Sequence, residues 1–256
     1  MHSKFPLLFH IVRRNWVVYK KDFVANTSPT LAEAVFVMLS LGLGLGGALN
    51  QVEGMSYMQF LAPGLTVSAA LFTAFFESSW GFYTRMTFEN VFKAMLTTPI
   101  SARDIVLGEY LWVGLKGAAF GFGVATVLAC FKLMVNPWLL PCLLGVGFLV
   151  GLSCGAMGLI STTLVRNMNQ FQSVYSFLIA PLYFLSGIFF PIENMPRAVR
   201  LVLECFPLIH GVRLAQAFFW NKGIVYALCY DGGLLLLQCL ILCAIGLRRI
   251  QNKLVL

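Results

Sequence analysis

The segment MTFENVFKAMLTTPISARD, residues 86–104, decides how the rest of this chain is interpreted. It is short and amphipathic, and it lies between two long apolar stretches. Five apolar side chains recur at the helical spacing i, i+3, i+4, i+7 and i+8, namely Phe88, Val91, Phe92, Met95 and Leu96. Glu89 lies off that face. Because an apolar helix face in a loop needs a partner, the segment predicts a docking surface for lipid headgroups or for another protein.

The same segment carries its own helix boundaries. Thr97, Thr98 and Pro99 end the first helix, since proline cannot continue it and restricts the residue before it. Ser101 and Asp104 have the spacing of a capping box, which predicts that another helix begins there. We therefore expect a loop helix over 86–98 that is separate from the helix following it.

The composition is that of a membrane protein. Hydrophobic residues make up 59% of the 256 residues and charged residues 11%, where a soluble domain has about 25% charged residues. Most of the seven cysteines lie in apolar runs, where thiols act as small hydrophobic groups rather than as disulfide partners. The net charge of +8 is explained by basic residues on the cytoplasmic side of a membrane, so no nucleic-acid partner is expected.

Six stretches are apolar and long enough to cross a bilayer, whose core needs about 20 residues as a helix. They are 31–49, 60–82, 104–131, 138–165, 172–190 and 224–247. The fold class is therefore an all-α membrane protein with six transmembrane helices, surrounded by membrane lipids.

Residues 1–30 precede the first span and combine a basic face with an apolar face that includes Trp16 and Tyr19. This pattern is typical of a helix lying in the membrane interface, and a solvent-facing tail is the alternative. Twelve of the 18 Lys and Arg residues lie in arms and loops on one side of the predicted spans and five on the other. That asymmetry predicts cytoplasmic N- and C-termini, with the 86–98 helix on the same side.

Residues 191–222 do not fit a simple span. A proline-bounded turn, a short apolar run and Pro207 indicate a re-entrant or interfacial hairpin on the outer side, because the run is too short to cross a bilayer. Arg197, Arg200 and Arg213 would then contact lipid headgroups or an anionic substrate.

The motifs of catalysis are missing from the sequence. His2, His10 and His210 are scattered without other ligands at metal-binding spacing, so no metal site is predicted. No phosphate-binding Gly-x-x-x-x-Gly-Lys-Ser/Thr motif occurs, so no nucleotide cofactor is expected in this chain. The ionisable residues within the predicted spans are Glu33, Glu77, Glu109, Lys116 and Asp231. They are either a proton relay, or residues that snorkel or pair, such as Lys116 with Glu77 or Glu109.

Aromatic side chains are concentrated on two of the predicted spans. Phe72 and Phe76 lie on the second, and Tyr175 and Tyr183 on the fifth. They line a substrate groove or pack the bundle, and spacing alone does not separate these alternatives.

An ordered series of motifs resembles the type 2 ABC exporter permeases. It consists of Phe60-Leu-Ala-Pro-Gly64, Phe92-Lys-Ala-Met-Leu-Thr-Thr-Pro-Ile100, Asp104-Ile-Val-Leu-Gly-Glu109, Phe184-Leu-Ser-Gly-Ile-Phe-Phe-Pro191 and Phe206-Pro-Leu-Ile-His210. With Gly42–Gly46, the series is most similar to the branch that exports nodulation-type lipooligosaccharides. The basic residues of 197–222 depart from that branch.

The resemblance implies one ABC-2 type transmembrane domain over 1–256, located in the bacterial cytoplasmic (inner) membrane. It also implies a homodimer that binds two copies of a separate ABC ATPase, which holds the ATP and Mg. The helix over 86–98 would be the coupling helix that contacts this ATPase. The chain would then be a non-catalytic exporter permease for an amphipathic glycolipid-like or drug-like substrate. The alternatives are an ATP-independent channel or secondary transporter, and an intramembrane enzyme.

Overall fold

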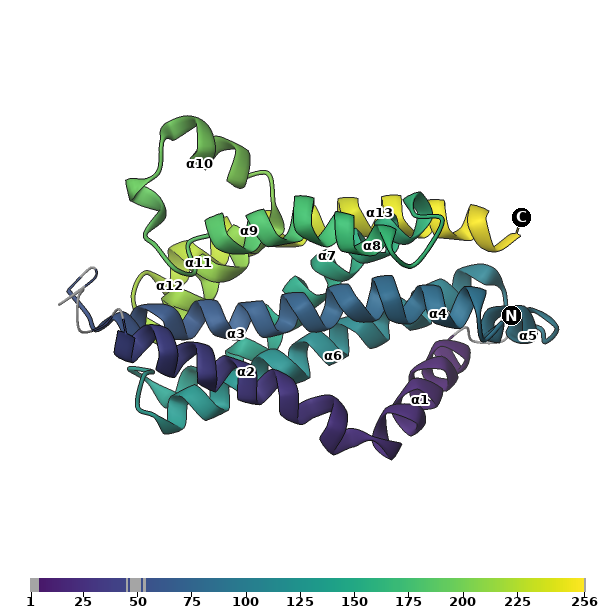
Figure 1. Ribbon diagram of the computed structural model, residues 1–256, viewed down its shortest axis with the longest axis horizontal. Helices are drawn as coiled ribbons and strands as arrows, with labels where there is room; N and C mark the ends of the chain where they lie inside the picture. Colours follow the sequence, from purple (N-terminus) through teal and green to yellow (C-terminus); the bar gives the residue numbers. More distant parts are fainter. Residues whose placement is uncertain (1–4, 45, 47–51, 53, 256) are drawn as a thin grey trace.

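The computed structural model describes residues 5–44, 46, 52 and 54–255. Within these ranges the regular secondary structure is helical, and the long helices lie side by side along one direction (Figure 1). Parts of two predicted elements fall outside the described residues: 1–4 of the interfacial helix, and 45 and 47–49 of the first span. The prediction of an all-α fold is confirmed.

Three helices form the centre of the bundle: α3 (Tyr57–Phe76), α6 (Ala102–Cys130) and α7 (Cys142–Leu164). Glycine lets α6 and α7 approach closely, because a Cβ added to Gly117 would lie 2.8 Å from the Cα of Gly151. The main hydrophobic core, which includes Phe60, Phe75 and Leu128, surrounds this contact. These packed helices supply a rigid frame for the polar groups described below.

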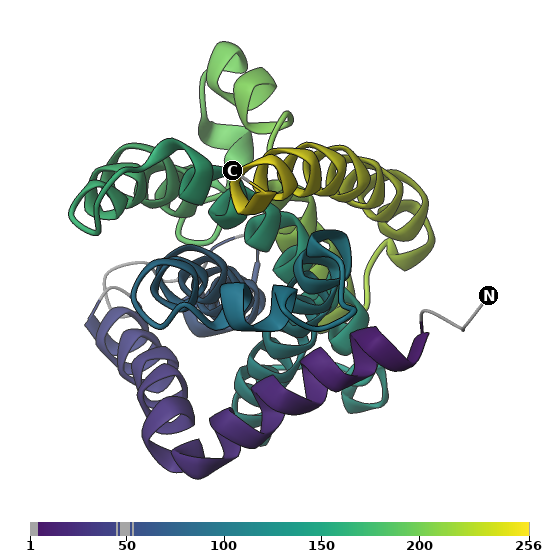
Figure 2. The same ribbon diagram turned by 90° about the vertical axis from the view of Figure 1, so that its right-hand side faces the viewer.

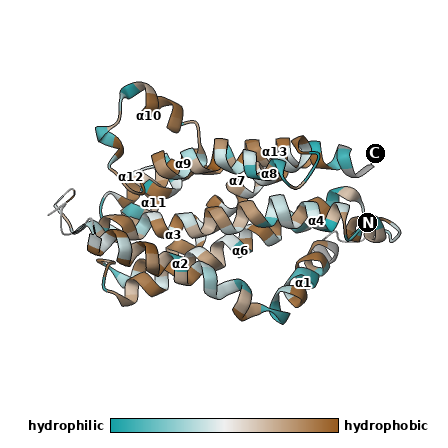
Figure 3. Cartoon of the chain, in the orientation of Figure 1, coloured by the Kyte–Doolittle hydropathy of each residue, from teal (hydrophilic) through white to brown (hydrophobic). Residues whose placement is uncertain are grey.

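Five helices of the described residues are long and apolar enough to cross a membrane, judged by length and composition. They are Phe23–Gly44, Tyr57–Thr87, Ala102–Cys130, Cys142–Leu164 and Ile224–Gln251. Apolar residues follow the lengths of these helices, whereas hydrophilic residues gather near the C-terminus and at the junction of α1 (Phe5–Lys21) and α2 (Phe23–Gly44) (Figure 3).

The predicted span 172–190 is not one continuous α-helix. It consists of α8 (Gln170–Val174), a π-helical turn over Tyr175–Ile179 and α9 (Ala180–Leu185). This run ends at Leu185, well before residue 190, so the sixth crossing stays a prediction.

The N-terminal helix α1 (Phe5–Lys21) crosses the end of the bundle instead of running along it (Figure 2). The next helix, α2 (Phe23–Gly44), begins only two residues later, so the interfacial helix is shorter than the predicted 1–30. Ile11 holds α1 against α6, because its side chain is 1% exposed and occupies the space where Gly108 has no Cβ.

The segment 191–222 forms two helices, α10 (Arg197–Leu203) and α11 (Pro207–Trp220). Most side chains of α11 are buried, including Phe219, so this helix is part of the core. The prediction of a re-entrant or interfacial hairpin on the outer side stays a prediction. Pro207 starts α11, since proline is tolerated in the first turn of a helix.

The chain ends with α12 (Ile224–Ala227) and α13 (Gly233–Val255). The remaining short elements are π-helical turns at Glu77–Gly81 and Leu228–Gly232, and 3-10 turns at Pro137–Leu139 and Ile192–Asn194. Helix α1, the short helix α5 (Val91–Leu96) and the C-terminal end of α13 share one end of the bundle, while α10 to α12 lie at the other (Figure 1).

Candidate functional site

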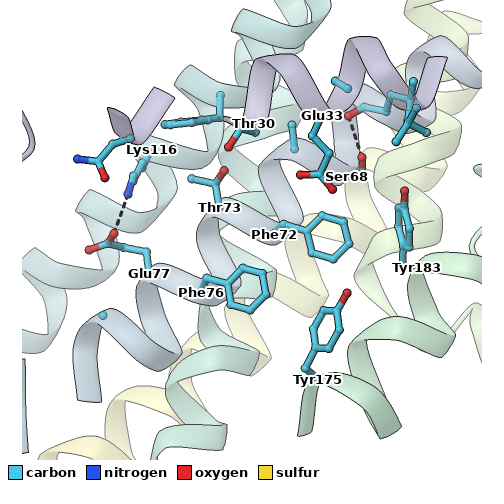
Figure 4. Close-up of a pocket in the computed structure, with 17 residues that line it drawn as sticks. Thr30, Glu33, Ser68, Phe72, Thr73, Phe76, Glu77, Lys116, Tyr175 and Tyr183 are labelled. Carbon is cyan, nitrogen blue, oxygen red and sulfur yellow. Dashed lines mark hydrogen bonds and ion pairs between the residues drawn. The ribbon is translucent and has the colours of Figure 1, made fainter. Parts of the chain in front are cut away.

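The structure brings all four predicted groove residues together around one cavity, here called the aromatic cavity (Figure 4). Phe72 and Phe76 come from α3, Tyr175 from the π-helical turn before α9, and Tyr183 from α9. The ring centroids of Phe72 and Tyr183 are 4.9 Å apart, and those of Phe76 and Tyr175 are 5.7 Å apart. The cavity has a volume of about 360 Å³, which is in the range of small-molecule sites.

Irregular helix turns lie on both sides of the aromatic cavity. The π-helical turn Glu77–Gly81 directly follows α3, and Glu77 and Gly81 line the cavity. The turn Tyr175–Ile179 brings Tyr175 to the opposite wall. Single π-helical turns inside helices occur frequently at functional sites, because the extra residue redirects the side chains around it.

Five charged side chains form a continuous set of ion pairs beside this cavity, here called the charged network. Its members are Arg14, Glu77, Arg85, Glu109 and Lys116. Arg14 Nη2 and Arg85 Nη2 donate to the two carboxylate oxygens of Glu109 at 2.6 and 2.9 Å. Arg85 Nη1 and Lys116 Nζ donate to the two oxygens of Glu77 at 2.8 and 2.7 Å.

The charged network connects three parts of the chain. Arg14 lies on α1, Glu109 and Lys116 on α6, and Glu77 and Arg85 on the turn and helix after α3. Burial of the Arg14 guanidinium lowers the pKa of this residue, while the Glu109 carboxylate opposes that shift. The pairing of Lys116 with Glu77 explains how a lysine is accommodated inside the predicted third span.

A second cavity, of about 280 Å³, lies next to the aromatic cavity. Its walls include Arg14 and Arg85 of the charged network together with Glu89 and Val91 of the loop segment. Both cavities are bounded by Asn26, Glu77 and Lys116. The Glu77–Lys116 ion pair therefore stands between the loop segment and the aromatic cavity.

The loop segment itself differs from the prediction of one helix over 86–98. Helix α4 (Phe82–Thr87) continues the long helix that begins with α3, and α5 starts only at Val91. Between them Asn90 has a left-handed conformation, with φ of +52°, which asparagine adopts more readily than most residues. The turn at Asn90 points α5 back toward the bundle, so the five apolar positions do not form one exposed stripe.

The prediction that Phe92 is the centre of an exposed docking face is wrong. Its side chain is 1% exposed, and its ring packs 4.7 Å from the ring of Phe82, centroid to centroid. Ile105, Val106 and Ile250 belong to the same buried cluster. Phe92 therefore anchors α5 to the bundle.

The other predicted coupling residues divide between surface and core. Phe88 is 63% exposed, Leu96 is 36% exposed, and Glu89 also lies at the surface. Val91 and Met95 are half-buried against the Phe92 cluster. Met95 Sδ accepts a hydrogen bond of 3.3 Å from Arg14 Nη1, which joins α5 directly to the charged network.

The predicted boundaries at the end of this segment are confirmed. Helix α5 ends at Leu96, shortly before Pro99. The capping box at the start of α6 is present, since Asp104 N donates to Ser101 Oγ at 3.2 Å and Ser101 N donates to Asp104 Oδ2 at 3.3 Å.

A second polar cluster lies at the opposite end of the bundle. The buried ring of His210 contacts Asp231 Oδ1 through Nδ1 at 2.9 Å and the main-chain oxygen of Glu204 through Nε2 at 3.0 Å. Arg213 Nη2 pairs with Glu204 Oε1 at 2.6 Å. Burial by itself lowers the pKa of Arg213. The carboxylates of Glu204 and Asp231 outweigh burial, so the pKa of Arg213 is raised above its ordinary value.

This second cluster changes two interpretations of the sequence. Asp231 does not snorkel, because it is 3% exposed and bonded to His210. Arg213 was predicted to contact lipid headgroups or an anionic substrate, together with Arg197 and Arg200. In the structure it pairs with Glu204 and Asp231 instead.

Two members of the charged network, Arg14 and Arg85, are not marked by any motif in the sequence. The alternative that Lys116 pairs with Glu77 is confirmed, whereas no prediction was made for partners of Arg14 and Arg85. A spacing of eight residues between Glu77 and Arg85 hinted that both lie on one face of a helix. Arg14 meets Glu109 from 95 positions away, which no local pattern reveals.

Within the described part of the chain, no group of three or more His, Cys, Asp or Glu side chains is arranged to hold a metal ion. All seven cysteines are free thiols. The site therefore consists of an aromatic cavity and a set of paired charges beside it.

Residues 6–220 match the family model described as the ABC-2 type transporter. The chain belongs to the ABC-2 type transporter family. It is 33% identical over 223 residues to Nodulation protein J of Rhizobium leguminosarum bv. trifolii, an alignment that covers 87% of this chain and 84% of the relative. Nodulation protein J of Rhizobium meliloti (strain 1021) is 31% identical over 223 residues, with the same coverage.

A more distant relative is the Inner membrane transport permease YadH of Escherichia coli (strain K12). It is 22% identical over 214 residues, which cover 83% of this chain and 82% of YadH. The ABC-2 family consists of non-catalytic membrane subunits. This ABC-2 chain is therefore a multi-pass membrane subunit of an ABC transporter and not an enzyme.

Proposed function

We propose that this ABC-2 subunit is the permease of an exporter in the bacterial cytoplasmic membrane. Two copies of the chain, each with six spans and cytoplasmic termini, would bind two copies of a separate ATPase. ATP and Mg bound by that partner would drive an amphipathic substrate across the membrane. The resemblance to lipooligosaccharide exporters suggests a glycolipid-like or drug-like molecule.

The observation that carries this proposal is the set of contacts between α5 and the aromatic cavity. Met95 on α5 contacts Arg14, Arg14 pairs with Glu109, and Arg85 joins Glu109 to Glu77 in the cavity wall. Because each contact is direct, a movement of α5 would be passed to Glu77 in the cavity wall. Closure of the ATPase dimer would use this connection to move the helices as rigid bodies.

The docking surface is the exposed part of the loop segment. Phe88 and Leu96 offer apolar area, and Glu89 and Lys93 offer charges of both signs beside it. An apolar centre with a polar rim is the usual composition of a protein–protein interface. Phe92 would support this surface from below, because it fixes the orientation of α5.

The test compares Arg14→Gln with Arg13→Gln in proteoliposomes that contain the permease and the ATPase. Both changes remove one positive charge from α1, but Arg13 is exposed and Arg14 contacts both Met95 and Glu109. We expect both variants to bind the ATPase, and Arg14→Gln alone to lose the stimulation of ATP hydrolysis by substrate. Equal stimulation in the two variants would contradict transmission through Arg14.

The rival function is transport without ATP, by a channel or a secondary transporter. Within the described residues, Glu77, Glu109 and Lys116 are all engaged in ion pairs, which suits a structural connection better than a chain of proton carriers. Substrate movement at the full rate by the permease alone, without ATPase or ATP, would favour this rival.

A further inference from the structure

We propose that the aromatic cavity binds the positively charged group of a lipophilic organic cation, with Glu33 as its counter-charge. This inference rests on the proposed exporter function and specifies the class of substrate that the cavity accepts. It depends on three features of the cavity: an unpaired carboxylate, aromatic walls, and a lysine that is already neutralised.

Glu33 lies in the middle of α2 and not near a span end as the sequence suggested, because α2 begins at Phe23. Its carboxylate points into the aromatic cavity, on the side of Phe72 and Tyr183 (Figure 4). Within the described part of the chain, no basic side chain lies within the 4.0 Å of a salt bridge to Glu33. Glu33 is exposed on this side of α2, so its carboxylate is free of internal partners among the described residues and accessible to a ligand in the cavity. Ionisable residues inside membrane spans are usually functional, which makes this carboxylate a candidate counter-charge.

The aromatic walls suit a cation. Phe72, Phe76, Tyr175 and Tyr183 surround the space that Glu33 faces. The faces of aromatic rings carry partial negative charge and attract ammonium and other organic cations at short range. The same rings provide apolar area for the hydrophobic part of such a ligand.

An anionic ligand fits this cavity less well. Lys116 is the basic residue of its lining, and its ammonium group is committed to Glu77 at 2.7 Å. The same group lies 5.0 Å from the ring centroid of Tyr19 and 5.8 Å from that of Phe120. The lining holds two carboxylates, Glu33 and Glu77, and one cation, Lys116, so its own net charge is −1. Arg85 shares Glu77 with Lys116 but does not itself line the cavity.

The aromatic cavity is also accessible from the side of the bundle. Helix α2 contributes Asn26, Thr30 and Glu33 to the lining, yet most of its surface lies outside the packed core. Because Glu33 is itself exposed, a lipophilic cation dissolved in the membrane would reach it without passing through the charged network.

The experiment measures binding of tetraphenylphosphonium and tetraphenylborate, which have nearly the same shape and opposite charge. Equilibrium dialysis is performed with the full-length permease in nanodiscs, without ATPase or ATP, and binding to empty nanodiscs is subtracted. We expect tetraphenylphosphonium to bind at least about tenfold more tightly than tetraphenylborate. We expect Glu33→Gln to remove this preference and Glu33→Asp to retain most of it.

The control is Glu193→Gln, which removes the same charge from an exposed site away from the cavity lining and should leave both affinities unchanged. Equal affinity for the two ions, or an unchanged preference in Glu33→Gln, would overturn the proposal. Retained tetraphenylborate binding by Glu33→Gln would show that this variant is folded. Failure of the ATPase to bind the permease would refute the exporter function and leave this binding result standing.

Discussion

Removing the negative charge of Glu109 is expected to destabilise the permease strongly. Glu109 is 1% exposed and accepts hydrogen bonds from Arg14, Asn15 and Arg85. Glu109→Gln keeps the size of the side chain but leaves the three cations of the charged network with Glu77 alone. Breaking a buried ion pair by removing one partner costs about 3–5 kcal/mol.

Lys116→Met is the matched comparison. It leaves Glu77 paired with Arg85 and gives the charged network two cations for two carboxylates. The methionine stays in contact with the aromatic rings around Lys116. We therefore expect a smaller loss, of about 1 kcal/mol, which is typical of a single substitution.

The assay is the midpoint of thermal unfolding in one detergent, followed by fluorescence-detected size exclusion of a fusion protein. In a protein of this size, 1 kcal/mol corresponds to about 2–4 °C, so Glu109→Gln should lower the midpoint by about 6 °C or more. A midpoint for Glu109→Gln that equals that of Lys116→Met would refute the reasoning that buried charge imbalance governs this site.

Three other predictions concern separate parts of the molecule. Phe92→Ala should cost about 3–5 kcal/mol of stability, because a fully buried ring is removed, and an unchanged thermal midpoint would show that α5 is not anchored by it. Phe76→Ala should change substrate-stimulated ATP hydrolysis while basal turnover remains normal; reduced yield with normal transport per complex would instead show a packing role. In single-cysteine variants that lack the seven native cysteines, a cysteine at Lys253 should be labelled from the cytoplasmic side and one at Asn194 from the outer side, and labelling of Lys253→Cys from outside would reverse the proposed orientation.

Local patterns predicted the parts of the fold that depend on local chemistry. Hydropathy located the central helices because a bilayer requires continuous apolar helices. The capping box at Ser101 and the helix end before Pro99 follow from hydrogen bonding and proline geometry within a few residues, and both are present.

Features that depend on tertiary contacts were not predictable in this way. Helical spacing placed Phe92 and Phe88 on one face, but the left-handed turn at Asn90 separates them and buries Phe92 against Phe82. The ion pair between Glu109 and Arg14 could not be predicted from local spacing either, because the two residues belong to different helices. The groove residues were predicted as a set because two separate aromatic stripes were visible, although only the structure shows that they share a cavity.

The measurement that tests the central claim most directly is site-specific photo-crosslinking to the ATPase. The photoreactive residue p-benzoylphenylalanine is introduced in place of Phe88, or in place of Phe131, an exposed phenylalanine just after the far end of α6. The account predicts a covalent permease–ATPase adduct from position 88 and none from position 131. An adduct from position 131, or none from position 88 in a complex that still hydrolyses ATP, would contradict docking of the ATPase on the loop between α4 and α5.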